Sequence, residues 1–434
     1  MAVEVRDAVG ADVAVLTGES ARELMVAVLS AVGGRLVEWT ATQVAYRPGA
    51  ATTASYTARV RWADGSVTSE RLGACSGSLP DGVARLGDGR TEIGMWRFPF
   101  DPALPGLPAA MDLERMRRLL GDAGLGAGGL PRPRVRAYRP MRRAVVEVSA
   151  PGGARIFVKA VHPRRARRLH ERHRVATAAG VAVPASLGWT DDGLVVLTAL
   201  PGRTLREELI TTGANRLDPD RLAGGVVGVL DALPVALATG RRRRTWGQKA
   251  PHYAEVIAGV LPPMADRARR IAASVDHDTP EGPDVAVHGD FYESQLMVAD
   301  GRIAGLLDID TAGRGERLDD AACLLAHLAV LAQIRPDRAE VINRLGSRLE
   351  RRFSRDLGRA ALARRTAAVV LSLATGPHRV QEAGWPQHTE RRVALAEQWL
   401  AFAEPTAPSA TSSTTSSTVE SSTVESSRSD VAAR

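Results

Sequence analysis

Hydrophobic and polar positions in residues 20–98 predict one helix followed by antiparallel strands. A capping-box pattern at Ser20–Glu23 precedes an apolar helical stripe that ends at Gly33. Strand-like runs then occupy 35–46, 53–62, 67–72 and 91–98, and a turn at 63–65 joins the second run to the third. These elements indicate a small α+β domain, and the proline-rich stretch 98–108 behind it is typical of a linker.

A second set of elements begins after this stretch. Strand-like runs occupy 135–140, 144–149, 155–160 and 194–200, with a turn at Pro151–Gly153 and a helix over 164–179. Residues 204–275 and 318–403 show mostly helical periodicity. Strands first and helices afterwards predict a two-lobed α+β body.

One short sequence recurs. Ala45–Pro48 and Ala137–Pro140 have the same four residues, and each precedes a strand, a glycine-containing turn and another strand. The first domain is on this reading a degenerate relative of the second lobe, with Arg71 near the position that Lys159 occupies in the lobe. Chance explains four matching residues equally well.

The predicted organisation has four parts. An N-terminal domain with its linker covers 1–110, a β-rich lobe covers 111–200, a helical lobe covers 201–404 and a tail covers 405–434. The tail is dominated by Ser and Thr, and Ser-Ser-Thr-Val-Glu at 416–420 is repeated at 421–425. Because such a segment buries too little apolar surface to offset its ordering entropy, we expect the tail to be disordered.

Charge and composition narrow the class of protein. The net charge of +8 raises nucleic-acid binding as an alternative, but aromatic residues make up 4% of the chain and do not interleave with the arginines. No apolar run approaches the roughly 20 residues that span a bilayer, residues 1–20 are unlike a signal peptide, and two cysteines provide no disulfide framework. We therefore predict a cytoplasmic protein that binds neither membrane nor nucleic acid. The sequence leaves its oligomeric state open.

The chemistry is concentrated after residue 285. A buried-strand pattern leads into His288-Gly289-Asp290, an amide follows at Gln295, and Asp308 lies eighteen residues beyond Asp290. A turn at Asp300-Gly301 makes a hairpin that would bring Asp290, Gln295 and Asp308 together. Phosphoryl transfer from ATP needs these groups, a carboxylate to orient the attacking hydroxyl and oxygen ligands for Mg²⁺. The alternative for Asp290 is an ordinary turn aspartate.

Further residues complete this interpretation. Lys159 ends the apolar strand Ile156–Val158 and is one of only two lysines; the other, Lys249, is assigned to a polar surface loop. Such a lysine can hold ATP phosphates, and Glu171 is its predicted partner, with a pair between Glu171 and a neighbouring arginine as the alternative.

Five residues near the catalytic stretch receive supporting or core assignments. Asp310 either faces the metal or caps a loop, His288 braces the catalytic loop, and Asp320 caps its own helix or ties that loop down. Cys323 and His327 are assigned to the core.

These motifs resemble the aminoglycoside phosphotransferase family of small-molecule kinases. The similarity spans about residues 135–330 and implies a protein-kinase-like fold, with Asp290 as the catalytic aspartate, Gln295 and Asp308 as metal ligands, and Lys159 with Glu171 as the phosphate-anchoring pair. The stretch 195–205 resembles the family's hinge, which implies that the backbone around Thr198 and Leu200 binds adenine. The N-terminal domain is similar in position and element order to the cap domain of actinobacterial maltokinase-like members.

Three departures from the family pattern accompany this resemblance. Gln295 replaces the usual Asn, Thr198 stands where an acidic residue is frequent, and 140–143 lacks a glycine-rich phosphate loop, so that arginines are left to grip the nucleotide.

The sequence therefore predicts an enzyme, an ATP- and Mg²⁺-dependent phosphotransferase acting on a hydroxyl of a small molecule. A sugar or amino sugar is preferred over an aminoglycoside, because residues 334–403 are rich in Arg and sparsely acidic. Two alternatives are a non-catalytic nucleotide-binding protein and a basic nucleic-acid-binding protein.

Overall fold

The computed structural model describes residues 13–48, 51–87, 92–122, 124–125, 131–149, 155–213, 217–275 and 282–404. The elements below all lie within one compact unit, Met1–Ala403. The predicted turn at Pro151–Gly153 and the predicted disorder of the tail 405–434 fall outside the described residues.

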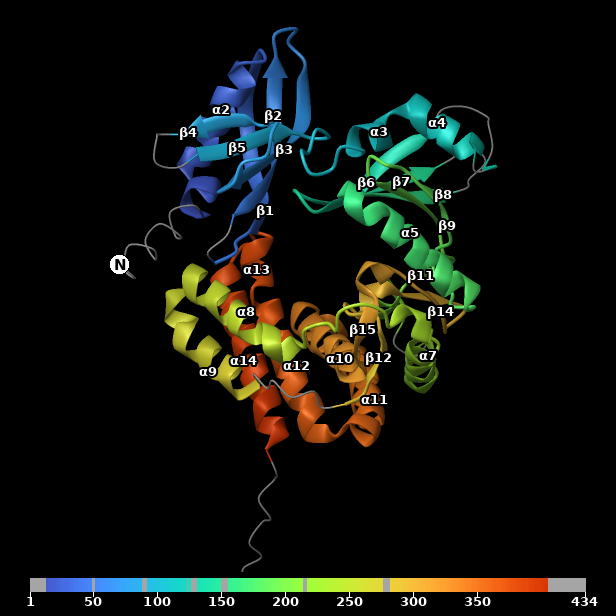
Figure 1. The fold of residues 1–434 in the computed structure, drawn as a ribbon. Helices are drawn as coiled ribbons and strands as arrows, with labels where there is room; N and C mark the ends of the chain where they lie inside the picture. The colour runs from blue at the N-terminus through green and yellow to red at the C-terminus, as the bar shows by residue number, and fades with distance from the viewer. Residues whose placement is uncertain are drawn as a thin grey trace, which may run out of the picture. The chain divides into compact units, whose positions relative to one another are not determined.

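The N-terminal domain is a five-stranded antiparallel sheet with a helix packed on it (Figure 1). Its strands are β1 (Gly34–Ala45), β2 (Thr53–Trp62), β3 (Val67–Ser76), β4 (Ala84–Gly87) and β5 (Glu92–Arg97), in the order β1-β2-β3-β5-β4. The short strand β4 was not predicted. The buried residues Met25 and Leu29 of α2 (Glu19–Ser30) share a core with Tyr56 and Val60 of β2.

The predicted capping box at Ser20–Glu23 is wrong. Helix α2 begins at Glu19, its N-cap is Gly18, and no side chain caps it. Residues 13–17 already form a helical turn, so the chain enters α2 from another helix and Ser20 lies inside the first turn. The spacing of a capping box was present, but the N-cap position with its extended backbone falls on Gly18, which has no side chain to accept a hydrogen bond.

The β-rich lobe contains a second five-stranded antiparallel sheet. Its strands are β6 (Arg132–Arg139), β7 (Arg143–Ser149), β8 (Arg155–Val161), β9 (Ser186–Trp189) and β10 (Leu194–Thr198), in the order β6-β7-β8-β10-β9. Numbered from its own first strand, this sheet has the same order as the N-terminal one. The likeness of the two domains thus extends beyond the four residues that the sequence repeats. Helix α5 (Pro163–Ala178) is inserted between the third and fourth strands.

The proline-rich stretch after β5 is packed rather than free. Leu104 and Leu107 are fully buried, and α3 (Leu107–Met111) and α4 (Leu113–Asp122) add buried residues to the core of the second sheet. Asp101, only 2% exposed, accepts hydrogen bonds from Tyr138 Oη and Met141 N, both at 2.8 Å. Trp96 Nε1 of β5 donates to the same Tyr138 oxygen at 2.8 Å. The stretch therefore fastens the N-terminal domain to the β6–β7 hairpin.

The helical lobe follows the second sheet. Its helices are α6 (Leu205–Thr211), α7 (Pro219–Asp231), α8 (Trp246–Val260), α9 (Ala265–Val275), α10 (Arg317–Ile334), α11 (Ala339–Leu357), α12 (Arg359–Ala374), α13 (Gly376–Arg379) and α14 (Trp385–Ala403). Helices α10 and α12 are buried along most of their length and form the centre of the lobe. Among the described residues, no helix has the length and apolarity needed to cross a membrane.

Two small sheets carry the predicted chemistry, and all their strands except β11 lie between α9 and α10 in the sequence. Strand β11 (Arg203–Thr204) pairs with β13 (Leu296–Ala299), which pairs with β14 (Arg302–Leu306), and β12 (Asp284–Val287) pairs with β15 (Gly313–Glu316). The buried Arg365 of α12 donates to Glu316 and Asp319 at 3.0 and 2.7 Å, which fixes this region on the helical core.

The predicted α+β, protein-kinase-like fold, with a β-rich lobe followed by a mainly helical lobe, is confirmed. The division at residues 110, 200 and 404 into separate domains stays a prediction.

Candidate active site

The loop after β12 has a backbone that only glycine permits at its centre. Gly289 has φ +81°, and a Cβ there would lie 2.6 Å from Arg243 Nε and 2.9 Å from the carbonyl oxygen of Thr311. The close approach of Arg243 and the left-handed backbone both require that no side chain be present. Asp290 follows directly and lies at the end of this turn.

His288 links this loop to the approach to Asp308. Its Nδ1 accepts a hydrogen bond from Asp290 N at 3.3 Å, so Nε2 carries the proton and donates to the carbonyl of Leu307 at 2.8 Å. The ring is buried and lies edge-on to Phe291. His288 thus braces Asp290 and the residue before Asp308 at the same time.

Asp320 holds the other side of the loop. It is fully buried in the first turn of α10 and accepts hydrogen bonds from His288 N and Gly289 N at 2.7 and 2.8 Å. Burial raises the pKa of this carboxyl, while the two backbone donors favour its ionised form. Its position matches the tying role predicted for it.

Lys159 reaches from the β-rich lobe to the loop after β14. Its Nζ lies 2.8 Å from Asp308 Oδ1 and 2.5 Å from Asp310 Oδ1, and the residue is 7% exposed. Burial opposes the lysine charge, but the carboxylates of Asp310 and Asp308 outweigh it and raise the pKa of Lys159. Lys159 thus forms one ion-paired group with two aspartates that lie 149 and 151 positions further along the sequence.

The predicted pair between Lys159 and Glu171 is not formed. The Glu171 side chain is 51% exposed, and its carboxylate lies 3.5 Å from Arg174 on the same helix. Lys159 instead pairs with the two carboxylates after β14, whose side chains are 16% exposed, and an ion pair there is stronger than one with the solvent-exposed Glu171. The intrahelical alternative describes Glu171 correctly.

Asp308 has a strained backbone. With φ 54° and ψ 47° it is one of four non-glycine residues at positive φ among those described, a conformation that aspartate tolerates better than most side chains. Burial opposes its charge, but Lys159 and Arg143, whose guanidinium lies 2.9 Å away, hold the pKa of Asp308 far below its usual range. The group is a permanent anion at neutral pH.

Asp290 has the opposite electrostatic environment. Burial raises the pKa of its carboxyl, and repulsion from Asp308 acts in the same direction. A carboxylate with a raised pKa is a better proton acceptor than an ordinary surface aspartate. Two aspartates close together thus have pKa values pushed apart, which is a common arrangement in active sites.

Gln295 lies at the entrance to the same hairpin. It is buried in the short 3₁₀ helix η4 (Glu293–Gln295), and Leu307 N donates to its carbonyl at 2.7 Å, so Asp308 directly follows a residue paired with Gln295. No group of three His, Cys, Asp or Glu side chains suited to a metal occurs in the described ranges. One carboxylate and one amide, completed by nucleotide phosphates and water, nevertheless fit the oxygen ligands that Mg²⁺ prefers.

The hinge residues lie between β10 and the helical lobe. Thr198 Oγ1 accepts a hydrogen bond from Ala185 N at 2.9 Å, so its side chain is engaged with the chain that precedes β9. Leu200 contacts β14, where a Cβ on Gly305 would lie 2.7 Å from its Cδ1. Their predicted contact with adenine stays a prediction.

A cavity of about 430 Å³ opens beside Asp290. Eight of its sixteen lining residues are arginines and two are aspartates, Asp290 and Asp310. We call this the arginine cavity, and its arginines are Arg139, Arg142, Arg143, Arg165, Arg168, Arg172, Arg241 and Arg243. They come from the β6–β7 hairpin, from α5 and from the loop before α8. Only the absence of a glycine-rich loop pointed to these arginines in the sequence.

Helix α8 contributes a residue that sequence reasoning misplaced. Lys249 lies on α8 rather than in a surface loop, with its Nζ 4.1 Å from the centroid of the Trp246 ring. Burial lowers the pKa of Lys249, and the positive charge of Arg243 lowers it further. The negative charges of Asp319 and Asp290 oppose this shift. Lys249 therefore adds a cation near Asp290. The signal in the sequence was the spacing of three residues between Trp246 and Lys249, which places both on one face of a helix. Pro251 inside the helix obscured it.

Glu293 and His327 each contact a neighbouring side chain. Glu293 is fully buried and accepts a hydrogen bond from Arg206 at 2.9 Å, which joins η4 to α6. His327 stacks on Tyr292, with ring centroids 4.2 Å apart. Burial lowers the pKa of His327 to about 3, so it is neutral, in agreement with its assignment to the core.

Comparison with protein families decides the class of the protein. The model of the phosphotransferase enzyme family matches residues 141–362, just over half of the chain. The chain belongs to this family. The matched region runs from the β6–β7 turn to α12 and includes Lys159, Asp290, Asp308 and Asp320. The prediction of a small-molecule phosphotransferase enzyme is confirmed.

Several solved structures are similar to this chain. They include the apo form of a thermostable mutant of aminoglycoside phosphotransferase APH(4)-Ia (15% identity, 64% of this chain and 97% of that chain, TM-score 0.46). They also include macrolide 2′-phosphotransferase MphH from Brachybacterium faecium (21%, 65% and 97%, TM-score 0.37). A third is amicoumacin kinase hAmiN in complex with AMP-PNP, Ca²⁺ and Ami (16%, 61% and 88%, TM-score 0.44). No curated protein sequence matches the chain.

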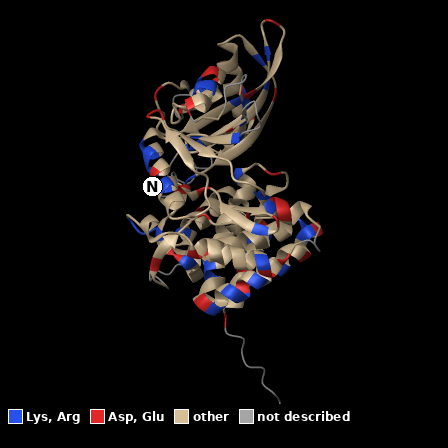
Figure 2. Ribbon diagram, turned by 90° about the vertical axis from the view of Figure 1, so that its right-hand side faces the viewer, with Lys and Arg blue, Asp and Glu red and all other residues tan. Residues whose placement is uncertain are grey.

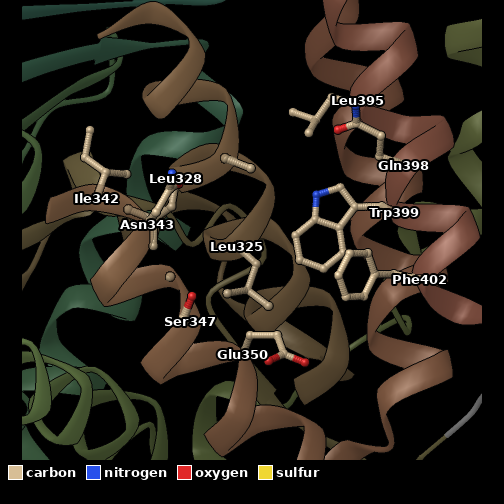
Figure 3. Close-up of a pocket in the computed structure, with 12 residues that line it drawn as sticks. Leu325, Leu328, Ile342, Asn343, Ser347, Glu350, Leu395, Gln398, Trp399 and Phe402 are labelled. Carbon is tan, nitrogen blue, oxygen red and sulfur yellow. The ribbon is translucent and has the colours of Figure 1, made fainter. Parts of the chain in front are cut away.

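A second cavity in this phosphotransferase has a different character. It has a volume of about 310 Å³ and lies among α10, α11 and α14, lined largely by apolar side chains such as Leu325, Leu328, Trp399 and Phe402 (Figure 3). Its one carboxylate, Glu350, accepts a hydrogen bond from Ser354. This cavity lacks the pairs of charged groups that phosphoryl transfer needs.

Proposed function

We propose that the protein transfers the γ-phosphoryl group of ATP to a hydroxyl of a small molecule. The observation that carries this proposal is the contact of Lys159 with Asp308, 2.8 Å across the two lobes, beside the partly buried Asp290. A lysine from the third strand of a β-rich lobe, a metal-binding carboxylate and a second carboxylate for the acceptor are the parts that phosphoryl transfer from ATP uses.

Asp290 is assigned to the acceptor hydroxyl. Its carboxylate orients the hydroxyl oxygen toward the γ-phosphorus and takes the proton late, because the transition state is largely dissociative and needs little early base catalysis. The raised pKa of Asp290 favours this proton transfer. His288 and Asp320 hold the backbone of Asp290 in place through hydrogen bonds of 2.7 to 3.3 Å.

Asp308 and Gln295 are assigned to Mg²⁺. When bound, the ion would neutralise charge on the β- and γ-phosphates as the bond between them breaks. Lys159 and Arg143 now contact Asp308, and in the nucleotide complex we expect their cationic ends to contact phosphate oxygens instead. Asp310 keeps Lys159 aligned during this exchange.

The acceptor is assigned to the sugar class rather than to the aminoglycosides. A polycationic drug requires acidic surroundings, whereas the arginine cavity that Asp290 lines has four times as many arginines as carboxylates. The stacked Tyr292–His327 pair next to Asp290 offers a flat, half-apolar surface of the kind that suits a sugar ring.

The test is a coupled ADP-release assay with Mg·ATP and a panel of sugars, amino sugars and aminoglycosides. Asp290→Asn should fold and bind ATP normally, yet lose turnover by about 10²-fold or more, because removal of an acceptor-orienting base removes an interaction made in the transition state. Asp300→Asn, an exposed change in the β13–β14 turn, is the matched control. Wild-type turnover in Asp290→Asn would refute the assignment.

A further inference from the structure

The arginine cavity contains more positive charge than its neighbours compensate. Arg143 is paired with Asp308 and Asp310, Arg172 donates to the carbonyl of Asp310, and Arg243 donates to the carbonyls of Thr311 and Gly289. The other five arginines have no carboxylate within ion-pair distance among the described residues.

Arginines elsewhere in the helical lobe are arranged differently. Basic and acidic positions are interspersed over its helices (Figure 2). Arg267 pairs with Glu397 at 2.7 Å, Arg269 with Glu255 at 2.8 Å and Arg335 with Asp337 at 2.6 Å. These arginines are neutralised one by one, whereas eight arginines converge on one cavity that contains two aspartates, so the concentration of positive charge in the cavity is a local feature.

The charges in the cavity repel one another. Burial lowers the pKa of Arg139, and Arg143 and Arg379 lower it further by repulsion. Burial and the charge of Arg168 act in the same way on Arg172. These guanidinium groups remain charged at neutral pH, because the ordinary pKa of arginine is above about 12. A bound anion would relieve a repulsion that the free protein must otherwise screen with solvent.

The cavity is continuous with the reaction centre. Asp290 and Asp310 line it, and Thr311 at the end of η5 (Ile309–Thr311) lies between them and the loop before α8. A molecule whose hydroxyl reaches Asp290 through this cavity must therefore lie against the arginines. Its volume of about 430 Å³ falls within the roughly 300–1,000 Å³ of small-molecule sites.

We infer that the acceptor carries a negatively charged group, a phosphate or a carboxylate, in addition to the hydroxyl that is phosphorylated. This inference rests on the proposed phosphotransferase function and specifies its substrate class. The nucleotide phosphates already have Lys159 and Arg143, which contact the proposed metal ligand Asp308. Arg168 and Arg241 are left for a second anion, and guanidinium groups match the paired oxygens of phosphate and carboxylate.

The reaction conserves the anionic group. The bond between the γ-phosphorus and the bridging oxygen of ADP breaks, and a bond forms between that phosphorus and the acceptor oxygen. The hydroxyl proton passes to Asp290 and then to solvent. The products are ADP and a phosphomonoester that keeps its original phosphate or carboxylate.

The test measures binding before turnover. Asp290→Asn protein saturated with Mg·AMP-PNP, so that the nucleotide phosphate sites are filled, is titrated calorimetrically with inorganic phosphate, glucose 6-phosphate, glucuronate, glucose and glucosamine. We expect the anionic sugars to bind at least about tenfold more tightly than glucose or glucosamine, since hydrogen bonds to charged groups are the strong ones.

The variant Arg168→Ala/Arg241→Ala should lose that preference by about tenfold and keep its affinity for Mg·AMP-PNP. Arg167→Ala is the control, because Arg167 is an exposed arginine on the same helix that does not line the cavity. Equal or tighter binding of glucosamine or glucose, or no binding of inorganic phosphate, would overturn the inference. The inference would also be overturned if Arg168→Ala/Arg241→Ala lost affinity for Mg·AMP-PNP and kept the preference for anionic sugars. These arginines would then bind ATP.

A turnover measurement distinguishes failure of the anionic-acceptor inference from failure of the proposed phosphotransferase function. If wild-type protein binds an anionic sugar but releases no ADP with any probe, the phosphotransferase assignment to this site fails and the anion site stands. If wild type phosphorylates only neutral or cationic acceptors, the assignment stands and the anionic acceptor is wrong.

Discussion

Asp101 offers a sharp test of how the β6–β7 turn, the proposed phosphate loop, is held. Its carboxylate accepts hydrogen bonds from Met141 N, Tyr138 Oη and Ala103 N at 2.8, 2.8 and 2.9 Å. Met141 has φ +60°, a conformation that costs about 1–2 kcal/mol for a non-glycine residue. Asp101 therefore stabilises a strained turn directly before Arg142 and Arg143.

The perturbation is Asp101→Ala. A hydrogen bond to a charged group contributes about 1.5–3 kcal/mol, so losing the bond to Met141 removes roughly what offsets the strain. We expect the turn to relax and the Michaelis constant for ATP to rise about 5- to 30-fold, the factor that one to two kcal/mol represents. Asp101→Asn should have a smaller effect, because one amide oxygen can still accept a hydrogen bond.

The assay is steady-state kinetics with ATP as the varied substrate, together with the midpoint of thermal unfolding. Asp192→Ala is the control, because Asp192 makes a partly exposed ion pair with Arg115 at the edge of the same lobe. An unchanged Michaelis constant for ATP in Asp101→Ala, with the protein still folded, would refute the argument that this carboxylate positions the turn.

Three further predictions concern buried and exposed charges. Asp308→Ala should weaken Mg·ATP binding itself by about tenfold or more, measured by calorimetry with and without Mg²⁺, because it removes the proposed metal ligand and leaves Lys159 without one of its two partners. Glu171→Ala should change the Michaelis constant for ATP by less than about twofold, since its ion pair is exposed; a larger change would restore its predicted role. Burial lowers the pKa of the fully buried His173 to about 4, below the unfolded value near 6.5, so its contribution to stability is lost as pH falls through this window. His173→Gln should therefore lose about 2 kcal/mol less stability than wild type between pH 7 and pH 5, and parallel unfolding curves would contradict this.

The parts of the site that sequence reasoning located are those whose chemistry is local. His288, Asp290 and Gln295 precede the β13–β14 hairpin and Asp308 follows it, so their proximity follows from strand pairing over some twenty residues. Eight of the ten strands in the two large sheets were likewise predicted near their observed positions, because alternation and turn residues are short-range signals, whereas the four-residue strands β4 and β9 were missed.

Two of the errors concern contacts between distant segments. Lys159 has two possible carboxylate partners after β14 and one nearby in α5, and only the packing of the two lobes decides between them. Asp101 looked like an ordinary linker residue, since its partners Tyr138 and Met141 lie some forty positions away. Tertiary packing outweighs sequence proximity wherever burial changes the cost of leaving a charge unpaired.

The N-terminal domain touches both lobes, which has a mechanical consequence. Through Trp96 it is hydrogen-bonded to Tyr138 of the β-rich lobe, and through Tyr46 it lies against α8, where a Cβ on Gly259 would come within 2.9 Å of the tyrosine ring. The Trp96–Tyr138 contact is a buried hydrogen bond, and the Tyr46 contact is a close approach to α8 at a glycine. If the lobes separate to release product, the domain moves with the β-rich lobe and Tyr46 slides along α8. Any separation of the lobes is thereby coupled to the Tyr46 contact, and a bulkier residue at 259 would displace the tyrosine ring from α8.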